Sequence, residues 1–339
     1  MPPDQLTASP WTAEHPHTEP DGIEDTVRAV LAHLTGTPLD QAAARFGADP
    51  DDLAQAAHTY DLAGRGALIQ RTGNDWWHIN IQFAHWPAAE DLAVEHLAPL
   101  LAQGEDEGAL AAWWFIRKTP CWRLRLAPRQ HQFREQVSTV LDAMTSRGQL
   151  TRWWTGLYEP ETPAFGGEVG MDIAHRLFHA DSRAVLSWPS GPPLGRPELS
   201  VLLCSTMFDA AGLEWYERGD VWHRVTLERP LPGDHPRPQS QRMADDVRQL
   251  LQADTTLVGP LFGPHGPLAF AAYWAAAFQQ AGSRVGEAAR AGTLDRGLRS
   301  VLGYHVLFHW NRCGIPYAMQ SRLARAAREA ILGENTAPS

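Results

Sequence analysis

Residues 158–182, YEPETPAFGGEVGMDIAHRLFHADS, join an irregular acidic segment to a helix. Prolines interrupt the first part, which carries Glu159 and Glu161, and Gly166 and Gly167 form a turn. The apolar residues after this turn have helical spacing: Val169, Ile173, Leu177 and Phe178. Three polar residues lie three and four positions apart and are expected on one side of the helix: Asp172, His175 and His179.

The polar residues of this stretch allow two interpretations. An acid, two imidazoles and a glycine turn at the start of a helix are groups that general acid–base chemistry on a bound substrate needs. A capped surface helix with half-buried, hydrogen-bonded histidines has the same pattern. The residues of the stretch alone favour the second interpretation, so evidence for a function has to come from the rest of the chain.

Composition and charge exclude several classes of protein. The chain has 339 residues, 44% hydrophobic and 20% charged, as in a soluble globular protein with a large and a small domain or two medium ones. No apolar run approaches the roughly 20 residues that span a bilayer, and the N-terminus has no signal-peptide pattern. The three cysteines lie far apart without a CxxC pair, which suggests a reducing cytosol. The net charge of −10 argues against a nucleic-acid surface. We therefore predict a cytoplasmic protein that binds neither membrane nor nucleic acid.

The sequence predicts three regions. Residues 1–22 are expected to be a disordered tail, and residues 23–70 a small helical unit that resembles a helix-turn-helix. The third helix of this unit begins Asp51-Asp52 and lacks a basic face, so it is expected to dock a peptide or pack on the main domain rather than bind DNA. Residues 71–335 form the predicted catalytic domain.

The predicted catalytic domain mixes strands and helices, which gives an α+β fold. Alternating or strand-like sequence predicts strands at 77–83, 113–118, 121–126 and 150–158 and, after a turn at Gly219-Asp220, within 214–228. Helical spacing predicts helices at 90–102, 129–147, 198–211, 240–253, 267–290, 294–312 and 315–333.

Two further groups of polar residues are candidates for a site. Arg123 and Arg125 share one face of a predicted strand and suit anionic or carbonyl oxygens, although a solvated face is equally compatible. The helix at 294–312 concentrates polar groups on an otherwise apolar segment: Tyr304, His305, His309, Asn311 and Arg312. Such groups are costly to bury without partners, so they are better candidates than exposed charges. The histidine pairs 175/179 and 305/309 are either metal ligands or acid–base groups around an organic substrate.

A family resemblance goes further than these patterns. Four segments in order resemble the glutamate-elimination domain of lanthipeptide dehydratases and related thiopeptide biosynthesis proteins: WHINIQF (77–83), FIRKTPCWRLRL (115–126), the stretch 158–182 and HWNR (309–312). The resemblance covers roughly residues 75–333 and implies the mixed sheet with packed helices of that domain.

The eliminating members carry an arginine before a Tyr-Gly-Gly and a histidine near an Asn-Arg pair. Arg123 and Arg125 match their first segment, but Ala164 replaces the arginine and Phe165 the tyrosine. The histidine corresponds to His309 or, two residues earlier, to Leu307. With its short AFGG segment, the chain looks instead like a thiopeptide pyridine synthase of the thiomuracin type.

This resemblance implies a formal aza-[4+2] cycloaddition between two dehydroalanines of a modified precursor peptide. Water and then the leader peptide, as a carboxamide, are lost and a pyridine remains. The acid–base candidates are Tyr304, His309, Asp172, His175 and Glu161. The substrate-binding candidates are Arg123, Arg125, Phe165, Asn311 and Arg312. No cofactor and no metal ion are predicted.

Two alternatives remain open at this point. One is a glutamate-elimination enzyme in which another arginine, such as Arg176, replaces the missing one. The other is a non-catalytic partner that binds the precursor peptide. The sequence fixes neither the core peptide nor the oligomeric state, and a homodimer is one option.

Overall fold

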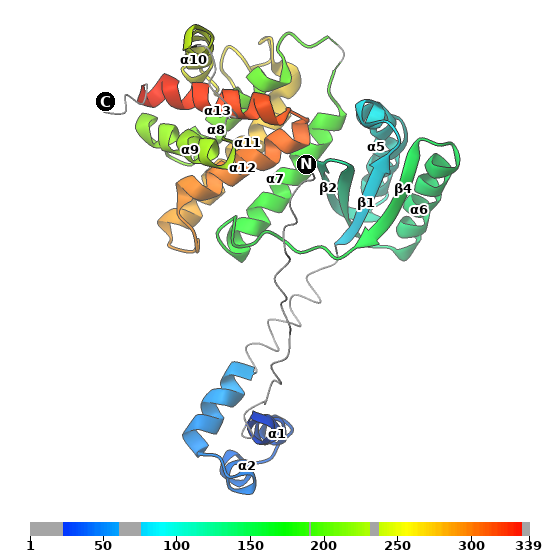
Figure 1. Ribbon diagram of the computed structural model, residues 1–339, viewed down its shortest axis with the longest axis vertical. Coiled ribbons are helices and arrows are strands. Elements are labelled where there is room, and N and C mark those ends of the chain that lie inside the picture. Colours follow the sequence, from blue (N-terminus) through cyan, green and yellow to red (C-terminus); the bar gives the residue numbers. More distant parts are fainter. Residues whose placement is uncertain (1–22, 61–75, 190, 231–236, 334–339) are drawn as a thin grey trace, which may run out of the picture. The chain divides into compact units, whose positions relative to one another are not determined.

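The computed structural model describes residues 23–60, 76–189, 191–230 and 237–333 (Figure 1). The chain divides into two compact units, Met1–Asp75 and Trp76–Ser339. The predicted tail at 1–22 and the end of the predicted small unit at 61–70 lie outside the described residues.

The first unit contains α1 (Ile23–Leu34), α2 (Leu39–Phe46) and a helix over residues 50–60, as predicted. Gly47 ends α2 with a φ of 68°, a conformation that favours glycine. Asp49 then caps the next helix, because its Oδ1 accepts the backbone N–H groups of Asp51 and Asp52 at 2.9 and 3.2 Å. Small apolar side chains, including Ala29 and Ala43, form a core of its own.

The second unit is built on a four-stranded antiparallel sheet in the order β2-β3-β1-β4. The strands are β1 (Trp77–Phe83), β2 (Leu110–Lys118), β3 (Cys121–Pro128) and β4 (Leu150–Gly156), which confirms the strands predicted at these places. One face carries Ile79, Ile81 and Leu124 into the main core. Figure 1 shows this sheet with α5 (Ala98–Asp106) and α6 (His131–Ser146) beside it. Short helical turns lead into α5: Trp86–Ala88, α4 (Ala89–Leu92) and Ala93–Leu97.

A layer of helices packs against the edge strand β2. It contains α7 (Glu168–Leu186), α8 (Arg196–Ala210), α9 (Trp215–Glu228), α10 (Arg237–Leu251), α11 (Ala272–Arg290), α12 (Leu298–Cys313) and α13 (Tyr317–Leu332). The backbone N–H of Phe115 donates to Ser182 Oγ at 3.1 Å, and Nε of Arg312 donates to the Phe115 carbonyl at 3.1 Å. These contacts join α7 and α12 to the sheet and complete the α+β fold.

The prediction of strands within 214–228 was wrong, because this segment is the helix α9. Val221 and Val225 suggest a strand by their branching, but they lie four residues apart and are both fully buried against the other helices. A capping box of Glu214 and Glu217 starts the helix. Tertiary burial and capping therefore outweigh local strand propensity here. None of the described helices is long and apolar enough to cross a membrane.

Candidate functional site

The sheet face turned away from α5 and α6 carries a row of candidate functional side chains. Trp114 on β2 pairs with Arg125 on β3, which in turn pairs with His78 on β1. Side chains at paired positions point to the same side of a sheet, so the three lie next to one another. Tyr158 and His175 cover this row from the segment before α7 and from α7 itself. We call these five residues the sheet-face site.

Arg125 is the charged centre of the sheet-face site. It is only 2% exposed, and its guanidinium carbon lies 4.1 Å from the ring centre of Trp114 and 4.9 Å from that of Tyr158. Its Nε and one Nη have no hydrogen-bond partner among the described residues. Burial lowers the pKa of Arg125 to about 10, although nearby Tyr158 and Glu161 oppose that effect. Arg125 therefore remains cationic at neutral pH, and two of its buried donors lack an acceptor among the described residues.

Tyr158 and His175 form a hydrogen-bonded pair beside Arg125. The hydroxyl oxygen of Tyr158 lies 2.7 Å from Nε2 of His175. Burial and then the charge of Arg125 lower the pKa of His175 to about 4. Burial also raises the pKa of Tyr158 well above its usual range, although Arg125 opposes this shift. Both groups are therefore neutral at pH 7, and the pair offers a proton donor next to a proton acceptor.

More charged groups surround the sheet-face site. Arg123 occupies the next row of the same face, since it pairs with Asn80 on β1. Burial lowers the pKa of Lys118, and the charge of Arg123 lowers it further. Glu161 acts in the opposite direction, whereas Arg229 adds to the lowering. One carboxylate oxygen of Glu161 is buried without a hydrogen-bond partner. Glu161 therefore lies as an acid among basic groups, with one buried oxygen that lacks a donor.

Aromatic rings wall the site on the side of α12. Phe165 is fully buried and its ring centre lies 5.1 Å from that of Phe308 and 6.4 Å from that of Tyr304. The Tyr304 hydroxyl donates to Glu228 at 3.3 Å. His305 also contacts Phe165, with ring centres 5.0 Å apart, and is fully buried. These rings exclude water, which strengthens the electrostatic interactions of the polar groups between them.

A buried ion network lies behind this aromatic wall. The carboxylate of Asp181 accepts hydrogen bonds from Nδ1 of His309 at 2.9 Å, from Trp274 at 2.8 Å and from Arg312. Burial opposes a charged imidazole, but Asp181 outweighs it and raises the pKa of His309 to about 10. The guanidinium of Arg312 also lies over the ring of Phe178, at 4.6 Å. The network thus locks α7, α11 and α12 together and supports the site from behind.

Asp181, His309 and Cys313 form a group whose ligand atoms lie within 4.8 Å of one another. A carboxylate, an imidazole and a thiol are all side chains that bind metal ions. However, the carboxylate already accepts hydrogen bonds from Arg312 and Trp274. A cation here would face a neighbouring guanidinium, so the donor set favours an ion pair over a metal centre.

The structure brings half of the predicted residues together. Five lie at the sheet face or in the aromatic cluster beside it: Arg123, Arg125, Glu161, Phe165 and His175. Tyr304 adjoins them through Phe165, whereas His309 and Arg312 belong to the buried ion network. Asn311 accepts a hydrogen bond from Gln320 at 3.1 Å.

Asp172, His175 and His179 lie three and four residues apart on α7, as predicted, but their side chains meet different partners and form no cluster. The Asp172 side chain is 77% exposed and pairs with Arg176 at 4.0 Å. His175 contacts Tyr158, whereas Nε2 of His179 lies 3.0 Å from Glu105. Each imidazole has its own partner, so the geometry does not favour a metal ion shared by this pair.

Sequence patterns missed several residues of the candidate site. The sequence placed His78 and Trp114 in strands but gave no reason to assign them to a site. Tyr158 lies at the start of the proline-broken segment, where no periodic spacing relates it to other residues. The alternation of Arg123 and Arg125 marked the face of β3 that carries the sheet-face site, and His78 alternates on β1 in the same way. That shared alternation was the one signal that pointed to His78.

Comparison with known proteins gives the family. The family model described as lantibiotic biosynthesis dehydratase C-term matches residues 76–331. The fold is similar to that of the tRNA dependent lantibiotic dehydratase MibB from Microbispora sp. 107891, with a TM-score of 0.55 and 19% identity, over 77% of this chain and 28% of MibB. It is also similar to TsrL, with a TM-score of 0.50 and 18% identity, over 75% of this chain and 95% of TsrL. A comparison with curated proteins found no match.

Proposed function

The chain belongs to the lantibiotic biosynthesis dehydratase C-terminal family, and from this premise we propose that it is a thiopeptide pyridine synthase. The proposed reaction joins two dehydroalanines of a modified precursor peptide. One dehydroalanine and the imidic-acid tautomer of the neighbouring amide form an azadiene, and the second dehydroalanine adds to it. Loss of water and of the leader peptide as a carboxamide then leaves the pyridine.

The observation that carries this proposal is the neutral Tyr158–His175 pair. Forming an imidic acid requires a proton to leave the amide nitrogen and another to reach the carbonyl oxygen. A neutral imidazole can accept a proton and a neutral phenol can donate one, and at 2.7 Å the two are able to exchange the proton between them. The same pair can then protonate the departing hydroxyl.

Arg125 and Arg123 are suited to hold carbonyl oxygens of the peptide. The unpartnered N–H groups of Arg125 would bind the amide oxygen and stabilise negative charge that develops on it. Glu161 is placed to orient a backbone N–H, and Tyr304 remains a second proton donor at the edge of the aromatic wall. The aromatic rings suit a peptide rich in flat heterocycles.

Phe165 and Ala164 distinguish this proposal from glutamate elimination. The side chain of Phe165 is fully buried among Phe178, Tyr304 and Phe308, and it brings no hydroxyl to the site. An eliminating enzyme of the resembling family has an arginine and a tyrosine at these positions. Glutamate elimination stays a second candidate because the basic groups near Arg125, which include Lys118 and Arg123, would also bind a glutamyl carboxylate.

Mass spectrometry on two synthetic peptides separates these candidates. A thiazole-containing peptide with a leader and two dehydroalanines should lose water and the leader carboxamide and gain the absorbance of a pyridine. A peptide with glutamylated serine should remain unchanged. Loss of glutamate from the second peptide, with no change in the first, would assign the eliminating activity instead. Binding without any change in mass would leave a precursor-binding role.

A further inference from the structure

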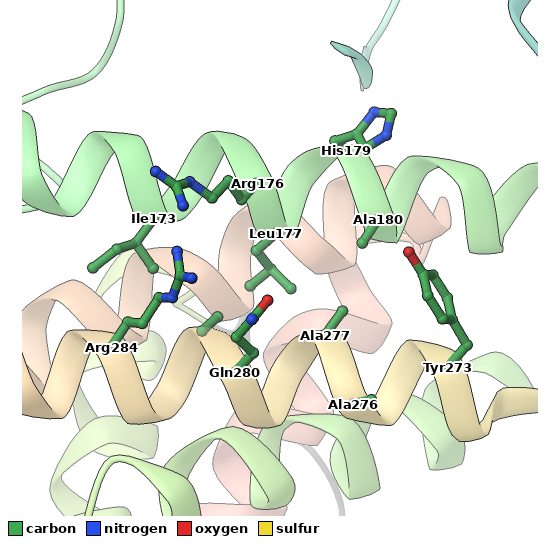
Figure 2. Close-up of a pocket in the computed structure, with 11 residues that line it drawn as sticks. Ile173, Arg176, Leu177, His179, Ala180, Tyr273, Ala276, Ala277, Gln280 and Arg284 are labelled. Atoms are coloured by element: carbon green, nitrogen blue, oxygen red, sulfur yellow. The ribbon is translucent and has the colours of Figure 1, made fainter. Parts of the chain in front are cut away.

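A groove runs between α7 and α11 (Figure 2). One part has a volume of about 290 Å³ and extends from Ile173 and Arg284 to Ala180 and Tyr273. A second part of about 400 Å³ continues past Arg176 and Arg284 towards Val169 and Thr293. The two parts share Ile173, Arg176 and Arg284, so they form one elongated hollow.

The floor of the groove is apolar and combines Ile173 and Leu177 of α7 with several alanines. Figure 2 shows Leu177 of α7 above Ala277 of α11, with Ala180 further along the same hollow. Small residues let a third helix approach closely and pack against both helices. The groove extends along α7 from residue 169 to residue 180, which corresponds to about 17 Å at 1.5 Å per residue. A helix of about three turns would fit this length.

Two arginines mark the middle of the groove. Arg176 projects from α7 and Arg284 from α11, one from each wall (Figure 2). The only ion pair of Arg176 in the described part of the chain is the exposed one with Asp172, at 4.0 Å, and such pairs contribute little. No hydrogen bond or ion pair joins Arg284 to another described residue. Both guanidinium groups are therefore available for carboxylates of a ligand.

The charges along the groove also set the direction of a ligand. Asp172 and Glu287 line only the part towards Thr293, whereas Gln280 and Tyr273 line the part towards Ala180. A bound helix should therefore place acidic residues over the two arginines and carry no acid over Asp172 and Glu287.

We propose that this groove binds an amphipathic, acidic helix in the leader of the precursor peptide. The identity of this ligand as a leader rests on the proposed function. The geometry links the two regions, because Arg176 faces the groove while its neighbour His175 faces Tyr158 in the sheet-face site. A leader held in the groove would keep the attached core peptide close to the site that His175 lines, and this raises its effective concentration there.

Fluorescence anisotropy on the full chain tests the proposal. The probe is a fluorescein-labelled peptide of about four helical turns, with leucines at positions i, i+4, i+7 and i+11 and two glutamates beside the middle leucines. Its matched control has glutamine in place of both glutamates. The variants are the double substitution Arg176→Gln/Arg284→Gln and, as a control on the same helix but outside the groove, Arg290→Gln.

The wild-type chain should bind the acidic peptide, and the double variant should bind it at least about tenfold more weakly. The glutamine peptide should bind the wild-type chain equally weakly, and Arg290→Gln should leave affinity unchanged. Equal affinity of the double variant and the wild type, or no binding of the acidic peptide by the wild type, would overturn the proposal.

The variant His175→Ala separates this proposal from the proposed function. It should bind the acidic peptide as the wild type does, because His175 does not line the groove and contacts Tyr158 instead. If the wild-type chain forms the pyridine but does not bind the acidic peptide, only the groove proposal is wrong. If it binds the acidic peptide but does not convert the dehydroalanine peptide, only the proposed function is wrong.

Discussion

The hydroxyl oxygen of Tyr158 and Nε2 of His175 lie 2.7 Å apart, beneath the buried guanidinium of Arg125. Burial and then the charge of Arg125 disfavour a protonated imidazole, and burial disfavours a phenolate, so the pair is held in its neutral form. A donor and an acceptor in direct contact, both uncharged, are suited to shuttle a proton on an amide without forming separated charges. The proposed chemistry depends on this relationship.

Substituting Tyr158 by Phe should lower turnover of the dehydroalanine peptide by a factor of about 10²–10⁴, the usual range for an acid–base group. Peptide binding should change little, because the ring and its contacts with Trp114 remain. The measurement is single-turnover mass spectrometry, with circular dichroism to verify folding. Tyr216→Phe is the matched control, since Tyr216 is 71% exposed on α9. Unchanged turnover in a folded Tyr158→Phe variant would remove this pair from the mechanism.

Substituting Arg125 by Gln should raise the pKa of His175, because the guanidinium charge lowers that pKa in the wild type. Burial still opposes the charged imidazole, so the pKa should stay below its usual value. If neutral His175 is the base, its protonation stops the reaction. The acid limb of the pH profile should therefore lie at a higher pH in the variant than in the wild type. A pH profile of kcat/KM measures this shift, with Arg147→Gln, an exposed arginine at the end of α6, as control. An acid limb at the same pH in wild type and variant would contradict the assignment of His175 as the base.

Substituting Asp181 by Ala should lower the free energy of unfolding by about 3–5 kcal/mol, the usual cost of leaving a buried charge unpaired. The variant would leave His309 and Arg312 without their shared carboxylate. Urea unfolding measures the effect. Asp172→Ala on the same helix should cost less than about 0.5 kcal/mol, because Asp172 is exposed. A loss of similar size in both variants would contradict the account of the buried network.

The stability of the fold should decline below about pH 6.5, the ordinary pKa of histidine. Burial lowers the pKa of His78 and His175 to about 4 and that of His305 to about 3. Each folded-state pKa is depressed, so the stabilising contribution is present above pH 6.5 and is lost as the pH falls towards 4. His309 has a raised pKa of about 10, so its contribution is full below pH 6.5 and declines as the pH rises towards 10. Unfolding free energy measured against pH should therefore be greatest near pH 6.5.

His305 offers a direct test of this pH dependence. It is 1% exposed and neither of its ring nitrogens has a hydrogen-bond partner among the described residues. His305→Leu should preserve or raise stability by about 1 kcal/mol, since an unsatisfied buried polar group is removed. It should also weaken the loss of stability in acid. A variant that is less stable at pH 7 and equally sensitive to acid would refute this account of His305.

Local signals in the sequence were sufficient for most elements of the fold. The turn and cap from Gly47 to Asp49 defined the helix over 50–60, and the alternation of Trp122 and Leu124 with Arg123 and Arg125 defined β3. Where propensity and burial disagreed, as at Val221 and Val225, the sequence predicted a strand and the structure has a helix. The division of the chain into a tail at 1–22, a unit at 23–70 and a catalytic domain at 71–335 stays a prediction, as does a cytoplasmic location.

The site was less predictable, because it depends on contacts between distant segments. Arg125 and His175 were identified as separate candidates, but the contact of Arg125 with Tyr158 arises only when the segment before α7 folds over the sheet. Similarly, His309 was a good candidate because it is polar on an apolar helix, yet its partner Asp181 comes from α7. A single sequence shows that such groups need partners, but it does not show which residues supply them.

The central claim is tested most directly by incubating the purified chain with a leader-bearing thiazole peptide that contains two dehydroalanines, and measuring the mass of the products. The account predicts a macrocycle that has lost water and the leader carboxamide, together with pyridine absorbance, and predicts that Tyr158→Phe forms it far more slowly. An unchanged peptide, combined with loss of glutamate from a glutamylated peptide, would contradict the account and assign the chain to the eliminating branch of its family.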